Sequence, residues 1–393
     1  MFCKDMYELG SKRSSIRELF EYGKKRAEQV GKQNVFDFSL GNPSTPAPDC
    51  VKAALVSLAN SNPTALHGYT SAQGDKSVRE AVAANLSRRF GVDLNSDLIY
   101  MTCGAAASLC ITLRALTEEG DEYIVLAPYF PEYDVFIKSA GGKAVIVPFD
   151  DSNFKPDLTA LENAITSRTK AVIVNSPNNP SGVVYDENTL KKIAAILSKK
   201  SEQFGNPIFI ISDEPYRELA YDQAVPFTML FYANTIVCYS FSKSLSLPGE
   251  RIGYIAVSPR ATRATDLYLA LCGAGRSLGY VCAPSTYQFV IRECINALPD
   301  VESYRKNRDL LYSSLTEIGY DCVRPDGAFY LFVKSLEEDS VAFSERAKSL
   351  GLLIVAGDDF GAKGYVRIAY CVDFDMIKRS LPSFKKLYDS YRG

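Results

Sequence analysis

The chain has 393 residues, 47% of them hydrophobic and 23% charged, which is ample apolar material for a large buried core. The formal net charge of −2 excludes a partner chosen by bulk positive charge, such as nucleic acid. No run of about 18 apolar residues suggests a membrane span, and the polar first residues lack the apolar block of a signal peptide, so we expect a cytoplasmic protein without a membrane partner.

The first 44 residues are expected to form an N-terminal arm. The range 15–18 (SIRE) fits a helical capping box, and Leu19, Phe20 and Ala27 follow at helical spacing. This pattern predicts an amphipathic helix. We expect the arm, residues 1–44, to contribute to a smaller domain.

The middle of the chain alternates between short apolar strands and helices. Six runs rich in β-branched residues are predicted strands: 123–127, 143–147, 171–174, 208–211, 235–239 and 253–257. They are continuously apolar, which is typical of strands covered on both faces. Helical stretches such as 187–199 lie between them, so we predict an α/β domain, residues 45–285, with a mostly parallel sheet covered by helices.

The pattern changes after residue 285. A helix is followed by a predicted strand at 328–333, by another helix, and by strands around Ile354 and Val366. We therefore predict a smaller α+β domain, residues 286–393, which the N-terminal arm joins.

The cysteines and the one histidine limit the possible chemistry. Ten cysteines are scattered without a C-x-x-C pair, mostly within apolar runs, which predicts reduced, buried thiols and no structural zinc or other metal site. A Ser-His or Cys-His hydrolase would have to use His67, and no nucleophile motif lies near it. We expect His67 to have a structural or polar-contact role.

Polar and ionisable residues gather where the predicted strands end. In chain order they are Asn179 within the segment 175–182 (NSPNNPSG), then Asp213 and Tyr216, then Ser240, Ser242, Lys243 and Arg251. Ligands of doubly wound sheets bind beyond the carboxyl ends of the strands. We therefore expect these side chains to meet in one site.

The chemistry of these residues fits pyridoxal 5′-phosphate (PLP). The amine of Lys243 can condense with an aldehyde when enough of it is uncharged. A carboxylate at Asp213 can keep a pyridine nitrogen protonated, so that the ring accepts electrons. Asn179 and Tyr216 offer hydrogen bonds to a ring oxygen.

The phosphate of such a cofactor would also find partners. Phosphates bind at helix N-termini, and hydroxyls and a bidentate arginine add to such a site. The candidates are the helix start at Gly104, Ala105 and Ala106, together with Ser240, Ser242 and Arg251. Each feature alone has a plainer explanation, such as a surface lysine or a turn-capping aspartate. Their order and spacing favour one site.

The segment 240–253 (SFSKSLSLPGERIG) resembles the lysine signature of the class I and II aminotransferases, including the eight-residue step from lysine to arginine. The block 179–182 (NPSG) and the D-x-x-Y sequence at 213–216 follow the family's order, and the resemblance extends over residues 41–367. It implies a fold-type I PLP-transferase. Such an enzyme moves the amino group of an L-amino acid to a 2-oxo acid by a ping-pong mechanism.

The resemblance implies a catalytic role for three residues. Lys243 would hold PLP and move the proton of the reaction. Asp213 would pair with the ring nitrogen, and Tyr216, together with Asn179, would bond the ring oxygen.

Aromatic residues have further roles by the same resemblance. Phe130 would stack on the cofactor ring, although Tyr129 and Tyr133 stand close enough in sequence to take that place, and a core role for all three is the alternative. Tyr69 resembles the tyrosine that reaches the phosphate in the neighbouring subunit's site. The resemblance therefore implies a homodimer with shared active sites.

Substrate contacts are implied as well. Arg367 would bind the substrate α-carboxylate, with a surface position on a strand as the alternative, and Gly41 and Asn179 would line the substrate site. Arg276 precedes a stretch similar to one from which some family members send an arginine into the partner's site, one residue out of register. We hypothesise that Arg276 reads an acidic side chain such as that of aspartate or glutamate; pairing with an acidic residue near the domain interface is the alternative.

Two other functions stay open. A carbon–sulfur β-lyase would share Lys243, Asp213 and Arg367, and would release pyruvate, ammonia and a thiol. A non-enzymatic regulator on the same fold would carry a DNA-binding domain, for which the residues ahead of Gly41 leave no room. We therefore predict an aminotransferase whose partners are a small amino acid and a 2-oxo acid.

Overall fold

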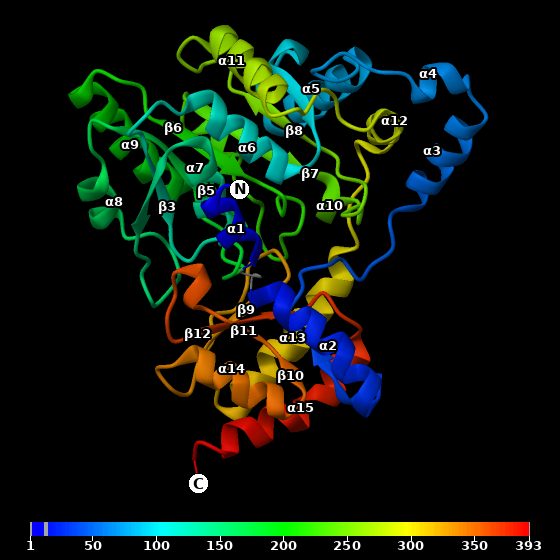
Figure 1. Ribbon diagram of the computed structural model, residues 1–393, viewed down its shortest axis with the longest axis vertical. Helices are drawn as coiled ribbons and strands as arrows, with labels where there is room; N and C mark the ends of the chain where they lie inside the picture. The colour runs from blue at the N-terminus through cyan, green and yellow to red at the C-terminus, as the bar shows by residue number, and fades with distance from the viewer. Residues whose placement is uncertain (1, 12–14, 393) are drawn as a thin grey trace.

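The computed structural model describes residues 2–11 and 15–392. Figure 1 shows two bodies stacked along the long axis, a larger one around a central sheet and a smaller one below it. The chain starts with a helical arm, builds the larger body, and passes through α13 (Val301–Ile318) into the smaller one. None of the helices in the described residues has the length and apolar character that crossing a membrane requires.

The larger body is built on a seven-stranded sheet with the order β2-β8-β7-β6-β5-β3-β4. Its strands are β2 (Ile99–Thr102), β3 (Glu122–Leu126), β4 (Lys143–Val147), β5 (Thr169–Asn175), β6 (Phe209–Asp213), β7 (Thr235–Ser240) and β8 (Gly253–Val257). All neighbours from β4 to β7 pair in parallel, and β8 runs antiparallel to β7 and β2. The mostly parallel sheet is confirmed, with one strand, β2, that the sequence did not predict.

Helices cover both faces of this sheet. The helices of the larger body are α3 (Asp49–Ala59), α4 (Pro63–His67), α5 (Lys76–Phe90), α6 (Ala105–Leu116), α7 (Glu132–Ala140), α8 (Leu158–Ala164), α9 (Glu187–Phe204), α10 (Phe241–Ser244), α11 (Ala264–Ser277) and α12 (Ser285–Cys294), of which α3 and α4 pack on α12. On β3, Tyr123 and Val125 pack with α6, α7 and α11. Ile124 and Leu126 point to the opposite face and pack with α8 and α9. A strand covered on both sides has to be apolar where nothing compensates a polar group, as residues 123–126 are. The buried Glu122 that begins β3 accepts hydrogen bonds from Thr166 and Arg168.

The smaller body combines two short sheets with three helices. Its elements are β1 (Phe36–Asp37), β9 (Tyr330–Lys334), β10 (Leu352–Leu353), β11 (Val355–Ala356), β12 (Tyr365–Ala369), α13, α14 (Ser340–Ser349) and α15 (Phe374–Asp389). Strands β11, β12 and β9 form an antiparallel sheet, and β1 pairs in parallel with β10. Single-turn 3₁₀ helices complete the structure: η1 (Lys32–Asn34), η2 (Ser96–Leu98), η3 (Thr228–Leu230) and η4 (Asp358–Phe360).

The N-terminal arm consists of α1 (Lys4–Ser11) and α2 (Ser15–Val30). In α2, Leu19 and Gly23 are buried against the smaller body, and a Cβ at Gly23 would lie only 2.6 Å from the Leu353 side chain. The hydroxyl of Ser15, which was expected to cap the helix, donates to the Asp359 carboxylate at 2.6 Å. The helix α2 of the arm thus packs on the smaller body, whereas α1 buries no residue and lies in front of the larger body (Figure 1). The domain limits at 45 and 286 stay a prediction.

The thiols differ from the sequence expectation. All ten cysteines are unpaired, but only Cys238, Cys294 and Cys371 are buried. The expectation of burial is wrong for the others, and Cys3 is exposed. An apolar stretch of sequence says little about a cysteine at its edge, since the face that such a residue presents depends on the packing. His67, at the end of α4, is exposed.

A loop of the larger body belongs to the core of the smaller one. Tyr216, Leu219 and Tyr221 follow β6 and pack in the same apolar cluster as Phe329 and Tyr370. The Tyr221 hydroxyl donates to the Ala328 carbonyl at 2.5 Å. This loop therefore ties the strand end that carries Asp213 to the second body.

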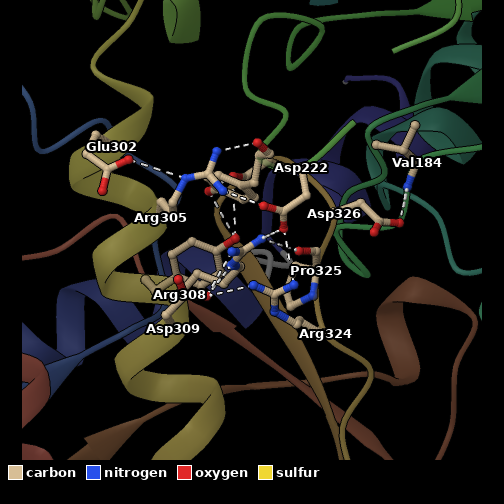
Figure 2. Close-up of polar contacts among 12 residues, drawn as sticks. Val184, Asp222, Glu302, Arg305, Arg308, Asp309, Arg324, Pro325 and Asp326 are labelled. Atoms are coloured by element: carbon tan, nitrogen blue, oxygen red, sulfur yellow. Dashed lines mark hydrogen bonds and ion pairs between the residues drawn. The ribbon is translucent and has the colours of Figure 1, made fainter. Parts of the chain in front are cut away.

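An ion-pair cluster strengthens the same junction (Figure 2). Asp222, next to the buried loop, accepts hydrogen bonds from three arginines: Arg308 at 2.9 Å, Arg324 at 3.1 Å, and Arg305. Two of these come from α13, and the Arg308 side chain is fully buried. Burying a guanidinium without a carboxylate partner costs free energy. The carboxylates of Asp222 and Asp309 together offset that cost for Arg308.

Replacing Asp222 with alanine is expected to lower the free energy of unfolding by about 2 kcal/mol, because it leaves Arg308 buried with less of its charge compensated. Thermal unfolding of the purified protein would measure the loss. The control is Asp266→Ala, which removes an exposed pair with Arg263 at 2.8 Å and should change the free energy by less than about 0.5 kcal/mol. Equal effects of the two substitutions would contradict the assigned importance of the cluster.

Candidate active site

A cavity of about 1130 Å³ lies between the carboxyl ends of β5, β6 and β7 and the smaller body. It brings together most of the site residues predicted from the sequence: Gly41, Ala105, Ala106, Phe130, Asn179, Asp213, Tyr216, Ser240, Ser242, Lys243, Arg251 and Arg367. Gly104 immediately precedes α6, whose first residues, Ala105 and Ala106, line the cavity. Tyr69 and Arg276 are not among the residues that line it. The structure therefore brings the polar strand ends together around one cavity, while the roles of the residues stay predictions.

Lys243 enters this cavity from the short helix that follows β7. The Ser240 side chain caps α10 by accepting from the Ser242 backbone N–H at 3.2 Å, which sets the turn that presents the lysine. The Lys243 amine donates to the Gly41 carbonyl at 2.6 Å. Burial, against the raising effect of Cys371 and together with the nearby charges of Arg367 and Arg251, lowers the pKa of Lys243 to about 8. A sizeable fraction of the amine is thus uncharged at neutral pH.

Asp213 is the last residue of β6 and is fully enclosed. Its Oδ2 accepts from the Tyr133 hydroxyl at 2.6 Å, whereas its Oδ1 is buried and has no hydrogen-bond partner among the described residues. Asn175 of the neighbouring strand donates its side-chain amide to the Asp213 carbonyl at 2.9 Å and so holds the strand end. Burial raises the pKa of Asp213 to about 7, against the lowering effect of Tyr133. The free oxygen can accept a hydrogen bond from a ligand.

An anion-binding corner lies at the start of α6. Gly104 has φ +89°, and a Cβ there would lie 3.0 Å from the Arg251 guanidinium, so only glycine lets the arginine come this close to the helix start. Arg251 donates to the Pro248 carbonyl at 2.9 Å, and the Ser240 hydroxyl donates to the Ser242 hydroxyl at 2.8 Å. Backbone N–H groups, two hydroxyls and a guanidinium together suit a phosphate.

Arg367 forms the opposite side of the cavity from the middle of β12. It donates to the Asn179 side-chain oxygen at 3.1 Å and to the Ser39 carbonyl at 2.5 Å, and it is buried. Its guanidinium lies 4.6 Å from the centre of the Tyr330 ring and 4.9 Å from that of Phe360. The Nε atom has no hydrogen-bond partner among the described residues. No carboxylate neutralises this cation within the described part of the chain, so it is suited to an anionic ligand.

The comparisons with known proteins agree with this geometry. The family described as aminotransferase class I and II matches residues 33–383. The chain belongs to this family. A probable aspartate aminotransferase of Methanocaldococcus jannaschii is 30% identical over 395 residues, covering 98% of this chain and 99% of the relative.

Solved structures resemble this aminotransferase over its whole length. An amino transferase from Eubacterium rectale is 57% identical, covers 100% of both chains and superposes with a TM-score of 0.98. The aspartate aminotransferase from Thermus thermophilus with maleate is 27% identical, with a TM-score of 0.86 and coverage of 96% and 97%. The predicted fold-type I architecture is therefore confirmed, and the protein is a transaminase.

Some residues of the site were not found from the sequence of this aminotransferase. The Tyr330 hydroxyl lies 2.9 Å from the Tyr216 hydroxyl. A Cβ at position 41 would come 1.9 Å from the Tyr330 hydroxyl, so the glycine at this position leaves room for Tyr330. Tyr330 lies in a predicted strand whose letters are apolar throughout, and no local pattern marks it. Tyr133 was named only as a stacking candidate, and the structure places its hydroxyl on Asp213.

Two predicted residues lie outside their own subunit's cavity. Tyr69, in the loop after α4, has 93% of its surface exposed, and Arg276 is exposed in the last turn of α11. The resemblance assigns Tyr69 to a neighbouring subunit's site, and Arg276 was compared with arginines that act from a partner. The structure describes one subunit, so both assignments stay predictions.

Proposed function

We propose that this aminotransferase holds PLP in the cavity through Lys243 and moves the amino group of an L-amino acid to a 2-oxo acid in two half-reactions. The observation that carries the proposal is the buried, unpartnered Oδ1 of Asp213, at the end of the strand next to the one that leads to Lys243. The protonated ring nitrogen of PLP would donate a hydrogen bond to Asp213 Oδ1, which has no partner among the described residues. The donor set fits the cofactor.

The chain's residues would divide the binding of PLP between them. The corner formed by Gly104, Ala105, Ala106, Ser240, Ser242 and Arg251 would take the phosphate, and Asn179 and Tyr216 would donate to the ring oxygen. Phe130 and Tyr129 line the cavity and remain candidates for stacking on the ring. Tyr133 is held by its hydrogen bond to Asp213, which favours Phe130 for that role.

When bound, PLP supplies an aldehyde for the amino group and a ring that accepts electrons from the bond being broken. The Nζ of Lys243 would take the proton from the substrate Cα and pass it to the aldehyde carbon of PLP, and its lowered pKa keeps the base form accessible near neutral pH. Arg367 binds the substrate α-carboxylate and so fixes which bond at Cα faces Lys243. Gly41, whose carbonyl accepts from that amine, lines the same space.

The wider setting is proposed from the family. A homodimer in which Tyr69 reaches the partner's phosphate corner would account for the exposure of this side chain. Relatives named as aspartate aminotransferases favour aspartate and glutamate among the amino donors. We propose a cytoplasmic enzyme of amino-acid metabolism.

The test is the visible absorption of the purified, PLP-loaded protein before and after L-glutamate is added without an acceptor. Loss of the yellow band, restored by a 2-oxo acid, is the expected result for both half-reactions. Release of pyruvate, ammonia and thiol from an S-substituted cysteine, with no need for a 2-oxo acid, would show the β-lyase instead. A protein that binds no PLP would overturn the proposal.

A further inference from the structure

Tyr330 stands between the cofactor side and the substrate side of the cavity. It is the first residue of β9, it lines the cavity, and its side chain is buried. Its hydroxyl lies 2.9 Å from the Tyr216 hydroxyl, and the two rings meet edge to face, with 5.7 Å between their centres. The Arg367 guanidinium lies 4.6 Å from the centre of the Tyr330 ring. One side chain thus touches a proposed cofactor residue and a proposed substrate residue.

The sheet of the smaller body fixes the position of Tyr330. Tyr330 pairs with Ala369 of β12, which makes Arg367 its diagonal neighbour on the same face of the sheet. The Phe329 ring packs against the Tyr330 ring with 5.1 Å between the centres. On the other side, a Cβ at Gly41 would lie only 2.7 Å from the ring carbon that carries the hydroxyl. The tyrosine ring therefore has little room to move.

The hydroxyl of Tyr216 can donate only one hydrogen bond. It is buried, and its hydrogen-bond partner among the described residues is the Tyr330 hydroxyl. An anionic ring oxygen is a stronger acceptor than a neutral hydroxyl, so with PLP bound Tyr216 would donate to the ring oxygen and accept from Tyr330. Burial, with Cys371 adding to it and Arg367 opposing it, raises the pKa of Tyr330 to about 12. Tyr330 therefore keeps the proton that this arrangement requires.

We propose that Tyr330 is a positioning residue for both sides of the site. Its hydroxyl orients the Tyr216 hydroxyl toward the ring oxygen of PLP, and its ring holds the Arg367 guanidinium in place for the substrate carboxylate. A hydroxyl whose oxygen accepts a hydrogen bond is a stronger donor, and an aromatic face attracts a guanidinium. This inference rests on the proposed function and deepens it.

Neighbouring aromatic residues do not combine these contacts. The Phe329 ring packs against Tyr216 but has no hydroxyl to donate. Phe360 lies 4.9 Å from the Arg367 guanidinium and likewise offers only its ring. Among the hydrogen bonds and ring contacts within residues 2–11 and 15–392, those of Tyr330 are the ones that join Tyr216 to Arg367.

The test of the hydroxyl is a pH titration of the visible absorption of the PLP-loaded protein without substrate. The yellow form carries a proton at the link between Lys243 and PLP, and a hydrogen bond to the ring oxygen favours loss of that proton. Tyr330→Phe removes only the hydroxyl, so the midpoint of the titration should rise by about half a pH unit. Tyr216→Phe should raise it further, and the double variant should match Tyr216→Phe alone, because Tyr330 acts through Tyr216. An unchanged midpoint in Tyr330→Phe, or additive shifts in the double variant, would overturn the proposal.

The test of the ring is the affinity of the PLP-loaded protein for propionate, an unreactive monocarboxylate, measured by the change that propionate causes in the same titration. Tyr330→Phe keeps the aromatic face over Arg367, so the affinity should stay within about 2-fold. Tyr330→Leu removes that face and should weaken propionate about 5-fold. Wild-type affinity in Tyr330→Leu would refute the role of the ring.

The matched control is Tyr320→Phe. The Tyr320 hydroxyl is buried in the smaller body and donates to the Phe384 carbonyl at 2.9 Å, but Tyr320 does not line the cavity. Its loss should lower the melting temperature and leave the midpoint and the propionate affinity unchanged. A midpoint shift equal to that of Tyr330→Phe would show a general effect of destabilisation and overturn the proposal.

The proposed function fails by a different result. A protein that takes up no PLP, or whose yellow form is converted by no L-amino acid, would refute the function itself. A yellow protein that L-glutamate converts, with the same midpoint in the wild type and in Tyr330→Phe, would refute only the role of Tyr330.

Discussion

Replacing Lys243 with alanine is expected to reduce amino-group transfer by about 10⁴-fold or more, because the variant loses both the amine that holds the cofactor and the base at the substrate Cα. Among the described residues that line the cavity, Lys243 is the only lysine, so none takes its place. Stopped-flow measurement of the half-reaction with L-glutamate would give the rate. PLP could still bind through Arg251 and the start of α6.

The control for this variant is Lys199→Ala. Lys199 is exposed and pairs with Glu162 at 2.6 Å, far along the chain from any cavity residue, and its loss should leave the rate within about 2-fold. Similar melting temperatures for both variants would show that the fold is kept. A rate in Lys243→Ala within tenfold of the wild type would contradict the assignment of Lys243.

Replacing Asp213 with asparagine is expected to lower the rate by about 10²- to 10³-fold, because a neutral amide does not hold the ring nitrogen in its protonated form. Tyr133→Phe keeps the carboxylate and removes one hydrogen bond, so its loss should be smaller, about tenfold. Half-reaction rates with L-glutamate would rank the two. A larger loss in Tyr133→Phe than in Asp213→Asn would contradict the role of the carboxylate.

The raised pKa of Asp213 also predicts how the free energy of unfolding of the protein without PLP depends on pH. Its pKa is raised from 3.8 to about 7 by burial, so between these pH values the folded protein keeps a proton that the unfolded chain has released. Unfolding then releases that proton, and the free energy of unfolding falls as the pH rises from about 4 to about 7. Melting temperatures measured across this window should show the fall in the wild type and a weaker slope in Asp213→Asn. An equal slope in both would show that other groups cause it.

Local patterns in the sequence predicted much of the fold. The runs 143–147 and 253–257 coincide with β4 and β8, and the other predicted strands lie within two residues of β3, β5, β6 and β7. These runs are mostly apolar at consecutive positions, which indicates a covered strand without knowledge of its neighbours. The edge strand β4 is the exception, because Lys143 and Ile146 are exposed. The four-residue strand β2 escaped the prediction because its short run has no repeat by which to recognise it.

Local patterns failed for residues whose importance comes from a distant partner. Tyr133 and Asp213 stand 80 positions apart, and Arg367 and Ser39 stand 328 positions apart. The sequence around Tyr133 gives no indication that its hydroxyl donates a hydrogen bond to a carboxylate. Such a contact depends on the order of the strands in the sheet and on how α7 lies across it.

The sequence by itself determined the kinds of groups at the site and their order: an aspartate at the end of one strand, a lysine after the next, and an arginine near the end of the chain. Chemical identity and short spacing are properties of the chain, and they were sufficient to indicate the cofactor and the family. Only the tertiary structure decided that Asp213 keeps one oxygen free and that Tyr133 holds the other. The reason is physical, because burial and hydrogen bonding arise from atoms that folding brings together. One buried contact can shift the pKa of a side chain or orient its charge, whereas the sequence shows only which residue type is present.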